Sequence, residues 1–494
     1  MMKVLSNNKQ IVKLLIFAFL FLSSVLMIKN DLQYNIARSH SDEIHTINFG
    51  INSLYSGEVT VLRVGETSRW LARAIYPVAL YYMNVNMGGE HFVTTWDYPS
   101  GYYIKKHFKK PNDVQNDPNL QDFVFAMKFV LGCLVLLSFL GASYMLSKYY
   151  GFLAGCLYFV LSTCSTLVTD MLTMFYTESS LIILFNLLVV LALTQTCNKW
   201  RLYIWSSVIL ALAISTKLTG VVFVLPIIAL IMFMDSILSG MKLEGFILLT
   251  IVFLAIINIY ASDYMELLDQ TLANVYHLKT GHRFTEPSGL YQLKNIITTL
   301  FPWVIIFPFA IGYIIYKKPA RYYFLSCVAV SSIIMIVALV GVSFFLERNL
   351  TTPQTLIIFI ISIATATVIR EINYKPQILF ILVTTLLICY QVVNVVDKYK
   401  SVTEARLRNY LKSSEHIATI DVEMGLVEHA TILESMPESF TLIKQLESFK
   451  AKFIPFDCVV IKRVKNNKHY TNYILPLDFK LIARHGNYFV FKRH

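Results

Sequence analysis

The chain has 494 residues, of which 56% are hydrophobic and 15% charged, and its formal net charge is +12. Soluble domains are about 25% charged, so this chain has too few polar residues to cover a water-exposed surface. The composition therefore excludes an ordinary soluble enzyme and favours a protein that folds within a lipid bilayer.

The first apolar run extends from Leu14 to Ile28 and follows three lysines, Lys3, Lys9 and Lys13. A basic segment before an apolar run also occurs in secretory signal peptides, which is the alternative interpretation. The run is long for a signal core, and no small-x-small cleavage site follows it. We therefore predict an uncleaved first membrane helix.

A membrane-spanning helix needs about 20 largely apolar residues. Runs of this kind predict an all-α membrane protein, a polytopic bundle of about 11 transmembrane helices. The least certain boundary is at Thr216-Lys217, where two short runs meet. The predicted spans are residues 11–28, 123–147, 150–168, 177–195, 202–216, 218–235, 243–260, 297–316, 321–342, 350–369 and 376–396.

The basic residues between these runs are distributed unevenly. With the N-terminus inside, the outer turns contain only two of them, Lys217 and Arg348. This asymmetry is the positive-inside pattern, and it accounts for much of the net charge without a nucleic-acid partner. The inner loops contain Lys148, Lys199, Arg201, Lys242, Lys317, Lys318, Arg321, Arg370 and Lys375.

An odd number of spans places three long segments on the extracytoplasmic side. Two are loops, at about 30–122 and 261–296, and the first includes an amphipathic stretch from Arg69 to Tyr82 that is suited to the membrane interface. The third is the C-terminal part. We therefore predict a transmembrane core at 1–396 and an extracytoplasmic domain at 397–494.

The predicted C-terminal domain is small and of the α/β class. Short apolar runs at His416–Val422 and Asp457–Val464 resemble strands, and Phe479–Lys492 alternates around His485-Gly486-Asn487 as a hairpin does. A helical pattern covers Pro437–Lys450.

Acidic candidates gather at the predicted outer membrane edge. Asp42 and Glu43 follow the first span, where partial desolvation can make a carboxylate a better base. The alternative is a capping box or solvated turn. Asp170 lies in the predicted turn after the third span, and Glu178 begins the fourth. For these two, the alternative is compensation of the helix dipole.

The cationic candidates Lys217 and Arg348 lie at the same predicted level. A phosphate leaving group is stabilised by fixed positive charge beside it. The alternatives are a snorkelling Lys217 and an Arg348 that only pairs with Glu347.

The second outer loop contains His277, His282 and Arg283. Two histidines and an arginine are suited to a metal or a phosphate, but no third metal ligand has the usual spacing, and the alternative is that the histidines have no ligand role. The seven cysteines form no CxxC or metal-like pattern either.

Taken together, the motifs resemble the GT-C superfamily of polyprenyl-phosphate-sugar glycosyltransferases. The branch they resemble most contains protein O-mannosyltransferases and lipid A aminoarabinose transferases. The sequence departs from that pattern at Asn349, where an aromatic residue is usual, and in its longer first loop. The resemblance is carried by Asp42-Glu43, Tyr176-Thr177-Glu178, Thr216-Lys217-Leu218-Thr219-Gly220 with Leu225-Pro226, Tyr276-His277 through Gly281-His282 with Pro287 and Tyr291, and Glu347-Arg348-Asn349-Leu350 with Pro353.

The resemblance implies inverting transfer of a sugar from a polyprenyl-phosphate donor to an acceptor hydroxyl outside the cytoplasm. It implies Asp42 as general base with Glu43 beside it, and Arg348 and Lys217 as ligands of the donor phosphate. No firm cofactor follows, although a divalent metal is compatible with it. We expect a bacterial inner membrane location. The motifs do not name the sugar or the acceptor.

Two alternatives remain open at this stage. One is a non-enzymatic transporter or flippase for a lipid-linked sugar, which would need ionisable residues at mid-span. The other is a polysaccharide polymerase that acts on lipid-linked oligosaccharides.

Overall fold

A computed structural model describes the chain in segments. The described residues are 2–35, 46–47, 66–86, 118–194, 199–234, 240–257, 289–342, 347–371, 417–420, 440–443, 458–462, 479–485 and 488–493. They divide into two compact units. The first comprises Met1–Lys29, His45–Ala79 and Met127–Val395, and the second comprises Asn30–Ile44, Leu80–Ala126 and Val396–His494.

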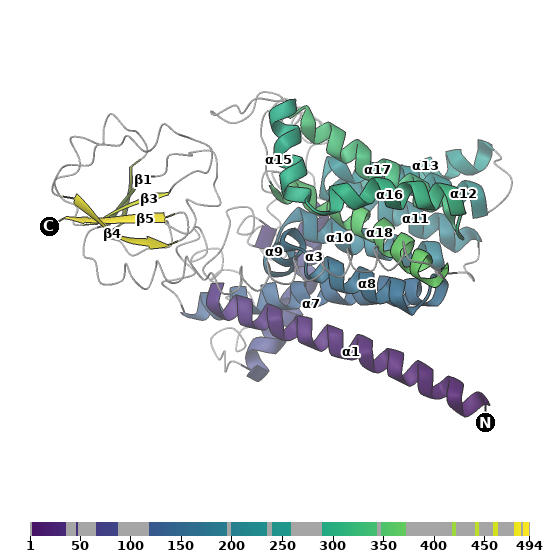
Figure 1. The fold of residues 1–494 in the computed structure, drawn as a ribbon, viewed down its shortest axis with the longest axis horizontal. Coiled ribbons are helices and arrows are strands. Elements are labelled where there is room, and N and C mark those ends of the chain that lie inside the picture. The colour runs from purple at the N-terminus through teal and green to yellow at the C-terminus, as the bar shows by residue number, and fades with distance from the viewer. Residues whose placement is uncertain are drawn as a thin grey trace. The chain divides into compact units, whose positions relative to one another are not determined.

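Helices make up the described part of the first unit (Figure 1). They coincide with ten of the eleven predicted apolar runs, whereas the run at 376–396 lies outside the described residues. Their bounds are α1 Met2–Asn35, α3 Glu66–Asn86, α7 Pro118–Tyr149, α8 Phe152–Thr163, α9 Thr166–Thr173, α10 Thr177–Leu193, α11 Lys199–Thr216, η1 Leu218–Phe223, α12 Val224–Met234, α13 Gly240–Ile257, α15 Leu290–Leu300, α16 Trp303–Lys317, α17 Tyr322–Val340, η2 Glu347–Leu350 and α18 Thr351–Glu371.

Four of the described helical segments are long and apolar enough to cross a membrane by themselves: Gln10–Lys29, Asp122–Tyr149, Tyr322–Val340 and Glu347–Glu371. The number rises to six if each of two bent pairs is one span. Shorter apolar helices of 10 to 17 residues cover four further predicted spans. The chain is therefore an integral membrane protein.

Bends divide two of the predicted spans. The predicted span at 150–168 is broken between α8 and α9, which meet at 72°, and the one at 297–316 is broken between α15 and α16, which meet at 83°. Pro302 lies in the second break, and a proline lacks the N–H that would continue a helix. The apolar pattern of the sequence does not predict such bends, because the helices on both sides of each bend are apolar.

Helix α18 forms the core of the bundle. All its residues from Thr351 to Ala366 are buried, and it packs against α8, α10, α16 and α17. Its Gln354 accepts a hydrogen bond from the Ser165 hydroxyl between α8 and α9. A second buried polar contact joins Tyr158 and Asn186, whose Oη and Oδ1 atoms lie 2.6 Å apart. Such contacts satisfy polar groups that no water reaches.

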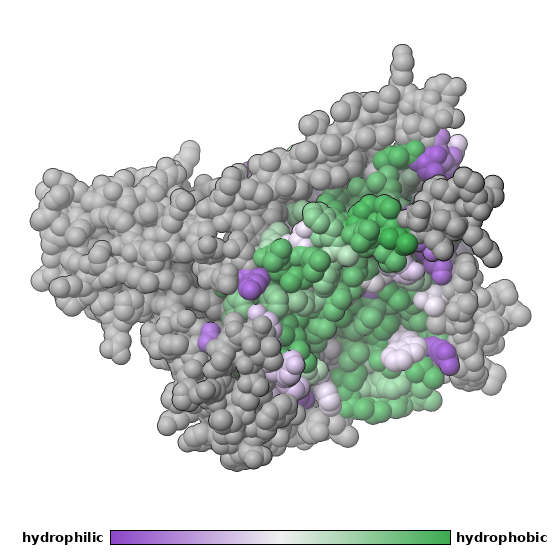
Figure 2. Space-filling view, turned by 90° about the horizontal axis from the view of Figure 1, so that it is seen from below, coloured by the Kyte–Doolittle hydropathy of each residue, from purple (hydrophilic) through white to green (hydrophobic). Residues whose placement is uncertain are grey.

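The outer surface of the bundle is strongly apolar. Figure 2 shows a broad hydrophobic face over the described helices, with hydrophilic residues at its margins. Among the described residues, many large apolar side chains are exposed, including Phe309 at 72% and Val337 at 63%. A surface of this kind is stable against lipid chains and would aggregate in water.

Helix α3 forms where the sequence predicts an amphipathic stretch. Its buried side contains Ala72, Ile75 and Ala79, while Val78 and Tyr81 are exposed. The prediction of a helix in the first long loop is therefore confirmed, whereas its position at the membrane interface stays a prediction.

The described C-terminal residues form a five-stranded sheet, with strand order β2-β1-β3-β5-β4. Strand β1 pairs in parallel with β2 and β3, and β5 pairs antiparallel with β3 and β4. The predicted hairpin at 479–492 is thus confirmed. The strands are β1 Ile417–Ile420, β2 Phe440–Ile443, β3 Cys458–Lys462, β4 Phe479–His485 and β5 Tyr488–Arg493.

One C-terminal prediction is wrong in part. Within the helical pattern at Pro437–Lys450, residues Phe440–Ile443 form strand β2, and the rest of that range lies outside the described residues. Phe440, Thr441 and Ile443 are aromatic or β-branched residues that suit a strand, and parallel pairing with β1 overrides the local helical periodicity.

Candidate active site

Three breaks in the helical bundle bring a cluster of ionisable side chains together. The first break precedes α10 and places Tyr176 and Glu178 there. The second lies between α11 and η1, at Lys217. The third is η2, which contains Arg348 and Asn349. Residues more than 130 positions apart in the sequence thus converge on one site.

An ion pair forms the centre of this cluster. Lys217 Nζ lies 2.6 Å from Glu178 Oε1 and donates a second hydrogen bond to Asn349 Oδ1 at 2.8 Å. The Thr177 hydroxyl donates to the other carboxylate oxygen, Oε2, at 2.9 Å. The Glu178 side chain is 3% exposed and that of Lys217 is 32% exposed. The carboxylate is therefore buried, whereas the lysine side chain is partly exposed.

The ammonium group retains capacity for another ligand. A lysine ammonium has three N–H donors, and two of them are used by Glu178 and Asn349 among the described residues. The third is available to an acceptor that approaches from the exposed side. A bound oxyanion is one such acceptor.

Arg348 adds a second positive charge beside this pair. Its guanidinium carbon lies 4.7 Å from the centre of the Tyr176 ring, which is a cation–π distance. Tyr176 immediately precedes α10, so the ring fixes Arg348 next to Glu178. Two cations and one carboxylate give these three side chains a formal charge of +1, which suits a negatively charged ligand.

The backbone around Lys217 explains its position. The residue has an extended conformation, with φ of −163° and ψ of 143°, which ends α11 and starts η1. Its N–H donates to Ala213 O at 3.2 Å, and its carbonyl accepts from the Gly220 N–H at 2.8 Å. A Cβ atom on Gly220 would lie 2.2 Å from Ala213 O, so only glycine permits this tight return of the chain.

Helix α3 packs against the same helix ends. The Thr67 hydroxyl donates to Leu212 O of α11 at 2.8 Å, and the Ser68 and Ser180 hydroxyls are 3.1 Å apart. These contacts join α3 to α11 and to the first turn of α10, and the next residue of α3, Arg69, is only 3% exposed. A segment from the first long loop therefore contributes to the surroundings of Glu178.

Two solved structures are similar to the chain. One is ArnT from Cupriavidus metallidurans bound to undecaprenyl phosphate, with 11% sequence identity, a TM-score of 0.49, and coverage of 96% of this chain and 97% of that chain. The other is the same protein in the apo state, with 11% identity, a TM-score of 0.47 and the same coverage. No protein-family model and no curated protein sequence matches the chain.

Of the predicted site residues, the structure brings together Glu178, Lys217 and Arg348. The Lys217–Glu178 pair gives the lysine a specific partner, so snorkelling alone does not explain its position. Likewise, Glu178 forms a defined ion pair in addition to its place in the first turn of α10. Their role in phosphate binding stays a prediction.

Asp170 does not lie where the sequence places it. It was expected in a turn, but it lies within helix α9, because the chain breaks earlier, at Cys164-Ser165. Its side chain is outside the described residues. The other predicted site residues, Asp42, Glu43, His277, His282 and Arg283, also lie outside them.

Two residues of the cluster, Tyr176 and Asn349, are not among the site residues that the sequence predicts. Asn349 stands out in the sequence only as a departure from the family pattern, yet its side chain holds Lys217. Tyr176 belongs to a quoted motif, but nothing in the sequence connects it with Arg348, which lies 172 positions away. Spatial convergence of this kind has no local sequence signal.

In the described part of the chain, no group of three or more His, Cys, Asp or Glu side chains is arranged to hold a metal ion. The prediction for His277 and His282 concerns residues outside that part.

Proposed function

We propose that the chain is a GT-C-type glycosyltransferase. It transfers a sugar, with inversion, from a polyprenyl-phosphate donor to an acceptor hydroxyl on the extracytoplasmic side of the membrane. The observation that carries this proposal is the Lys217–Glu178–Asn349 cluster with Arg348 beside it. The proposal also agrees with the order of the sequence motifs along the chain.

The proposed topology has eleven spans, with the cluster at the outer membrane edge. The long loops and the α/β C-terminal domain then lie on the same side as the cluster. The basic residues of the short inner loops support this orientation. We place the protein in a bacterial inner membrane, with the site facing the periplasm.

In the proposed reaction, the cations act on the leaving group. The bond between the anomeric carbon and the donor phosphate breaks, and its electron pair leaves with the lipid phosphate. The third N–H of Lys217 and the guanidinium of Arg348 offset the charge that develops there. Because Glu178 and Asn349 already hold the ammonium, little reorganisation is needed during the reaction.

A carboxylate completes the proposed mechanism. The acceptor oxygen attacks the anomeric carbon from the face opposite the phosphate, and its proton passes to Asp42 acting as general base. Glu43 orients Asp42 or takes its place. The products are the glycosylated acceptor and free polyprenyl phosphate, and the polyprenyl chain lies along apolar grooves between the spans.

The decisive experiment incubates the purified full-length protein with a polyprenyl-phosphate sugar and measures the release of free polyprenyl phosphate. We expect release from wild-type protein and none from Asp42→Asn, which should insert and purify normally. Lys148→Gln is the matched control, because it removes a charge from a predicted inner loop and should retain full activity.

Other results would favour the alternatives. Movement of the donor across a bilayer without its consumption would indicate a transporter. Release only from lipid-linked oligosaccharides would indicate a polymerase. Wild-type rates in Asp42→Asn would remove Asp42 from the mechanism.

A further inference from the structure

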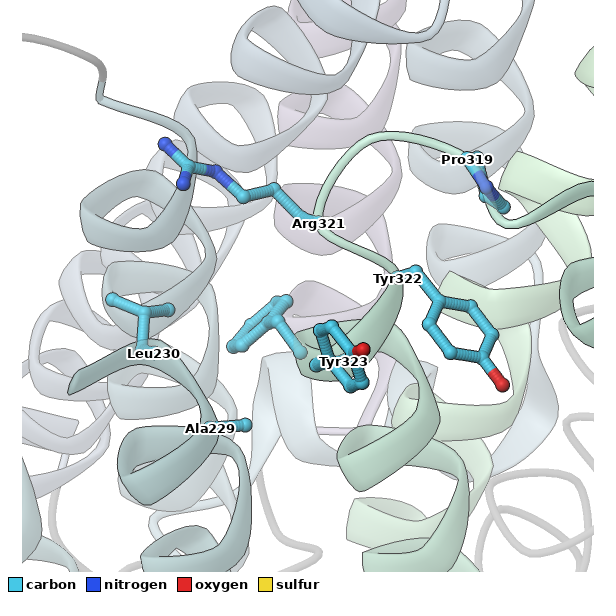
Figure 3. Close-up of a pocket in the computed structure, with 7 residues that line it drawn as sticks. Ala229, Leu230, Pro319, Arg321, Tyr322 and Tyr323 are labelled. Atoms are coloured by element: carbon cyan, nitrogen blue, oxygen red, sulfur yellow. The ribbon is translucent and has the colours of Figure 1, made fainter. Parts of the chain in front are cut away.

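A cavity of about 290 Å³ lies between α12 and the turn that joins α16 to α17 (Figure 3). Ala229 and Leu230 of α12 form one wall, and residues 319 and 321–324 form the other. The lining is mainly apolar and aromatic. Arg321 is its only charged residue, and its side chain extends from the turn toward the side where Leu230 lies.

The backbone of this turn is held in an unusual conformation. Lys318 and Arg321 both have positive φ angles, 45° and 62°, although neither is glycine. Such conformations persist only where surrounding contacts impose them. One such contact is the Tyr150 hydroxyl, which donates to Ala320 O at 2.5 Å. The turn therefore fixes the direction in which Arg321 leaves the backbone.

The charges near the cavity are unbalanced. Lys317 is neutralised, because its Nζ lies 2.6 Å from Glu371 Oε2, which also accepts from Tyr313 at 2.9 Å. Within the described residues, neither Lys318 nor Arg321 forms an ion pair. The turn that forms this wall of the cavity is therefore positively charged and suits an anion.

The surroundings indicate the depth of this cavity in the membrane. Tyrosines gather at these helix ends, with the Tyr322 and Tyr323 rings 5.3 Å apart and Tyr316 beside Lys317. Tyrosines and basic residues are enriched at the level of the lipid headgroups. On the same helices, Ile315 and Val330 expose about half of their surface, as residues that face lipid chains do.

We propose that this cavity binds the phosphate headgroup of an anionic glycerophospholipid. Arg321 is the ligand of the phosphodiester, with Lys318 in the same turn, and the acyl chains lie on the apolar surface of α12 and α17. Basic pockets between membrane helices are a recognised setting for such lipids. This inference does not depend on the proposed transferase activity, because the cavity lies in a different part of the bundle from Lys217.

The test is native mass spectrometry of the delipidated full-length protein in detergent, titrated with phosphatidylglycerol. We expect one tightly bound lipid in wild-type protein and about a tenfold weaker dissociation constant in Arg321→Gln, because a charge-assisted hydrogen bond is lost. Arg321→Lys should fall between the two, since a lysine keeps the charge but not the bidentate fork.

The matched control is Arg201→Gln, which removes an exposed positive charge from another predicted inner loop and should bind as wild type does. Phosphatidylcholine and inorganic phosphate serve as competing probes, and neither should displace phosphatidylglycerol. Equal affinity of Arg321→Gln and wild type would overturn the proposal. So would equally tight binding of phosphatidylcholine, whereas displacement by inorganic phosphate would show a site for free phosphate.

Discussion

Lys217 illustrates how a single side chain is prepared for a charged ligand. Its ammonium is held by Glu178 at 2.6 Å and by Asn349 at 2.8 Å. A lysine held in this way loses little side-chain entropy when a phosphate arrives, because its rotamer is already selected. The Glu178 carboxylate also lowers the formal charge of the cluster, so in the proposed reaction the lipid phosphate would be bound without being retained too tightly.

Removal of the Lys217 charge should therefore affect the reaction more than donor binding. For Lys217→Met, we expect a fall of about 10² to 10³ in kcat, by analogy with the loss of one electrostatic donor to a transition state. Steady-state kinetics with a polyprenyl-phosphate sugar measure this. A Lys217→Met variant that changes only KM would show that the lysine binds the donor equally in ground and transition states.

The Lys217–Glu178 ion pair should also affect the free energy of unfolding. The Lys217→Met change leaves the Glu178 carboxylate buried without its cation, and loss of one partner of a buried pair costs about 3 kcal/mol. The double variant Lys217→Met/Glu178→Gln removes both charges and should recover most of that loss. Thermal unfolding in detergent compares the three proteins, and an equally unstable double variant would contradict this account.

At the residue scale, part of the cluster follows from the sequence. Charged residues are rare in apolar surroundings, so Glu178, Lys217 and Arg348 attract attention by their position between spans. Asn349 and Tyr176 do not, because a neutral polar residue and an aromatic residue are common at helix ends. Their roles depend on partners that the chain brings together only after folding.

At the scale of elements, the breaks in the helices determine where the site lies. Each described residue of the cluster lies at a break: before α10, between α11 and η1, or in η2. The apolar runs predict the helices well, because each membrane helix must present apolar side chains to lipid or to a neighbouring helix. They do not predict the 72° bend that places Asp170 in α9, since bending leaves the apolar content unchanged.

The break at Lys217 provides the prediction at this scale. In Gly220→Ala, the new methyl group would lie 2.2 Å from Ala213 O, a backbone atom that cannot move without displacing α11. We expect a loss of about 1–3 kcal/mol and reduced transfer, because η1 and Lys217 must shift. Unfolding temperature and transfer rate measure the two effects.

Gly245→Ala is the matched control for this variant. A Cβ atom at Gly245 in α13 has no neighbour within 4 Å. Alanine there should be neutral or stabilise the helix by up to about 1 kcal/mol, with unchanged activity. Equal effects of the two substitutions would show that the close approach at Gly220 has no particular importance.

At the scale of the whole molecule, two kinds of sequence pattern predict two kinds of structure, a helical bundle and a β-hairpin. The apolar runs indicate a bundle whose exposed faces suit lipid. The C-terminal hairpin at Phe479–Arg493 follows from alternation along the chain. The pairing of β1 with β2 and β3 does not, because parallel partners are distant in sequence and leave no turn signal between them.

The side of the membrane on which this sheet lies depends on the number of spans. In the proposed topology, eleven spans with the N-terminus inside place the sheet outside, together with the cluster at Lys217. A reporter active only outside the cytoplasm, fused after His494, should therefore be active, and one fused after Lys148 should be inactive. A cytoplasmic signal from the fusion after His494 would mean an even number of spans. The run at 376–396 would then be the first to re-examine, because its removal changes the side of the sheet but leaves Lys217 and Arg348 in place.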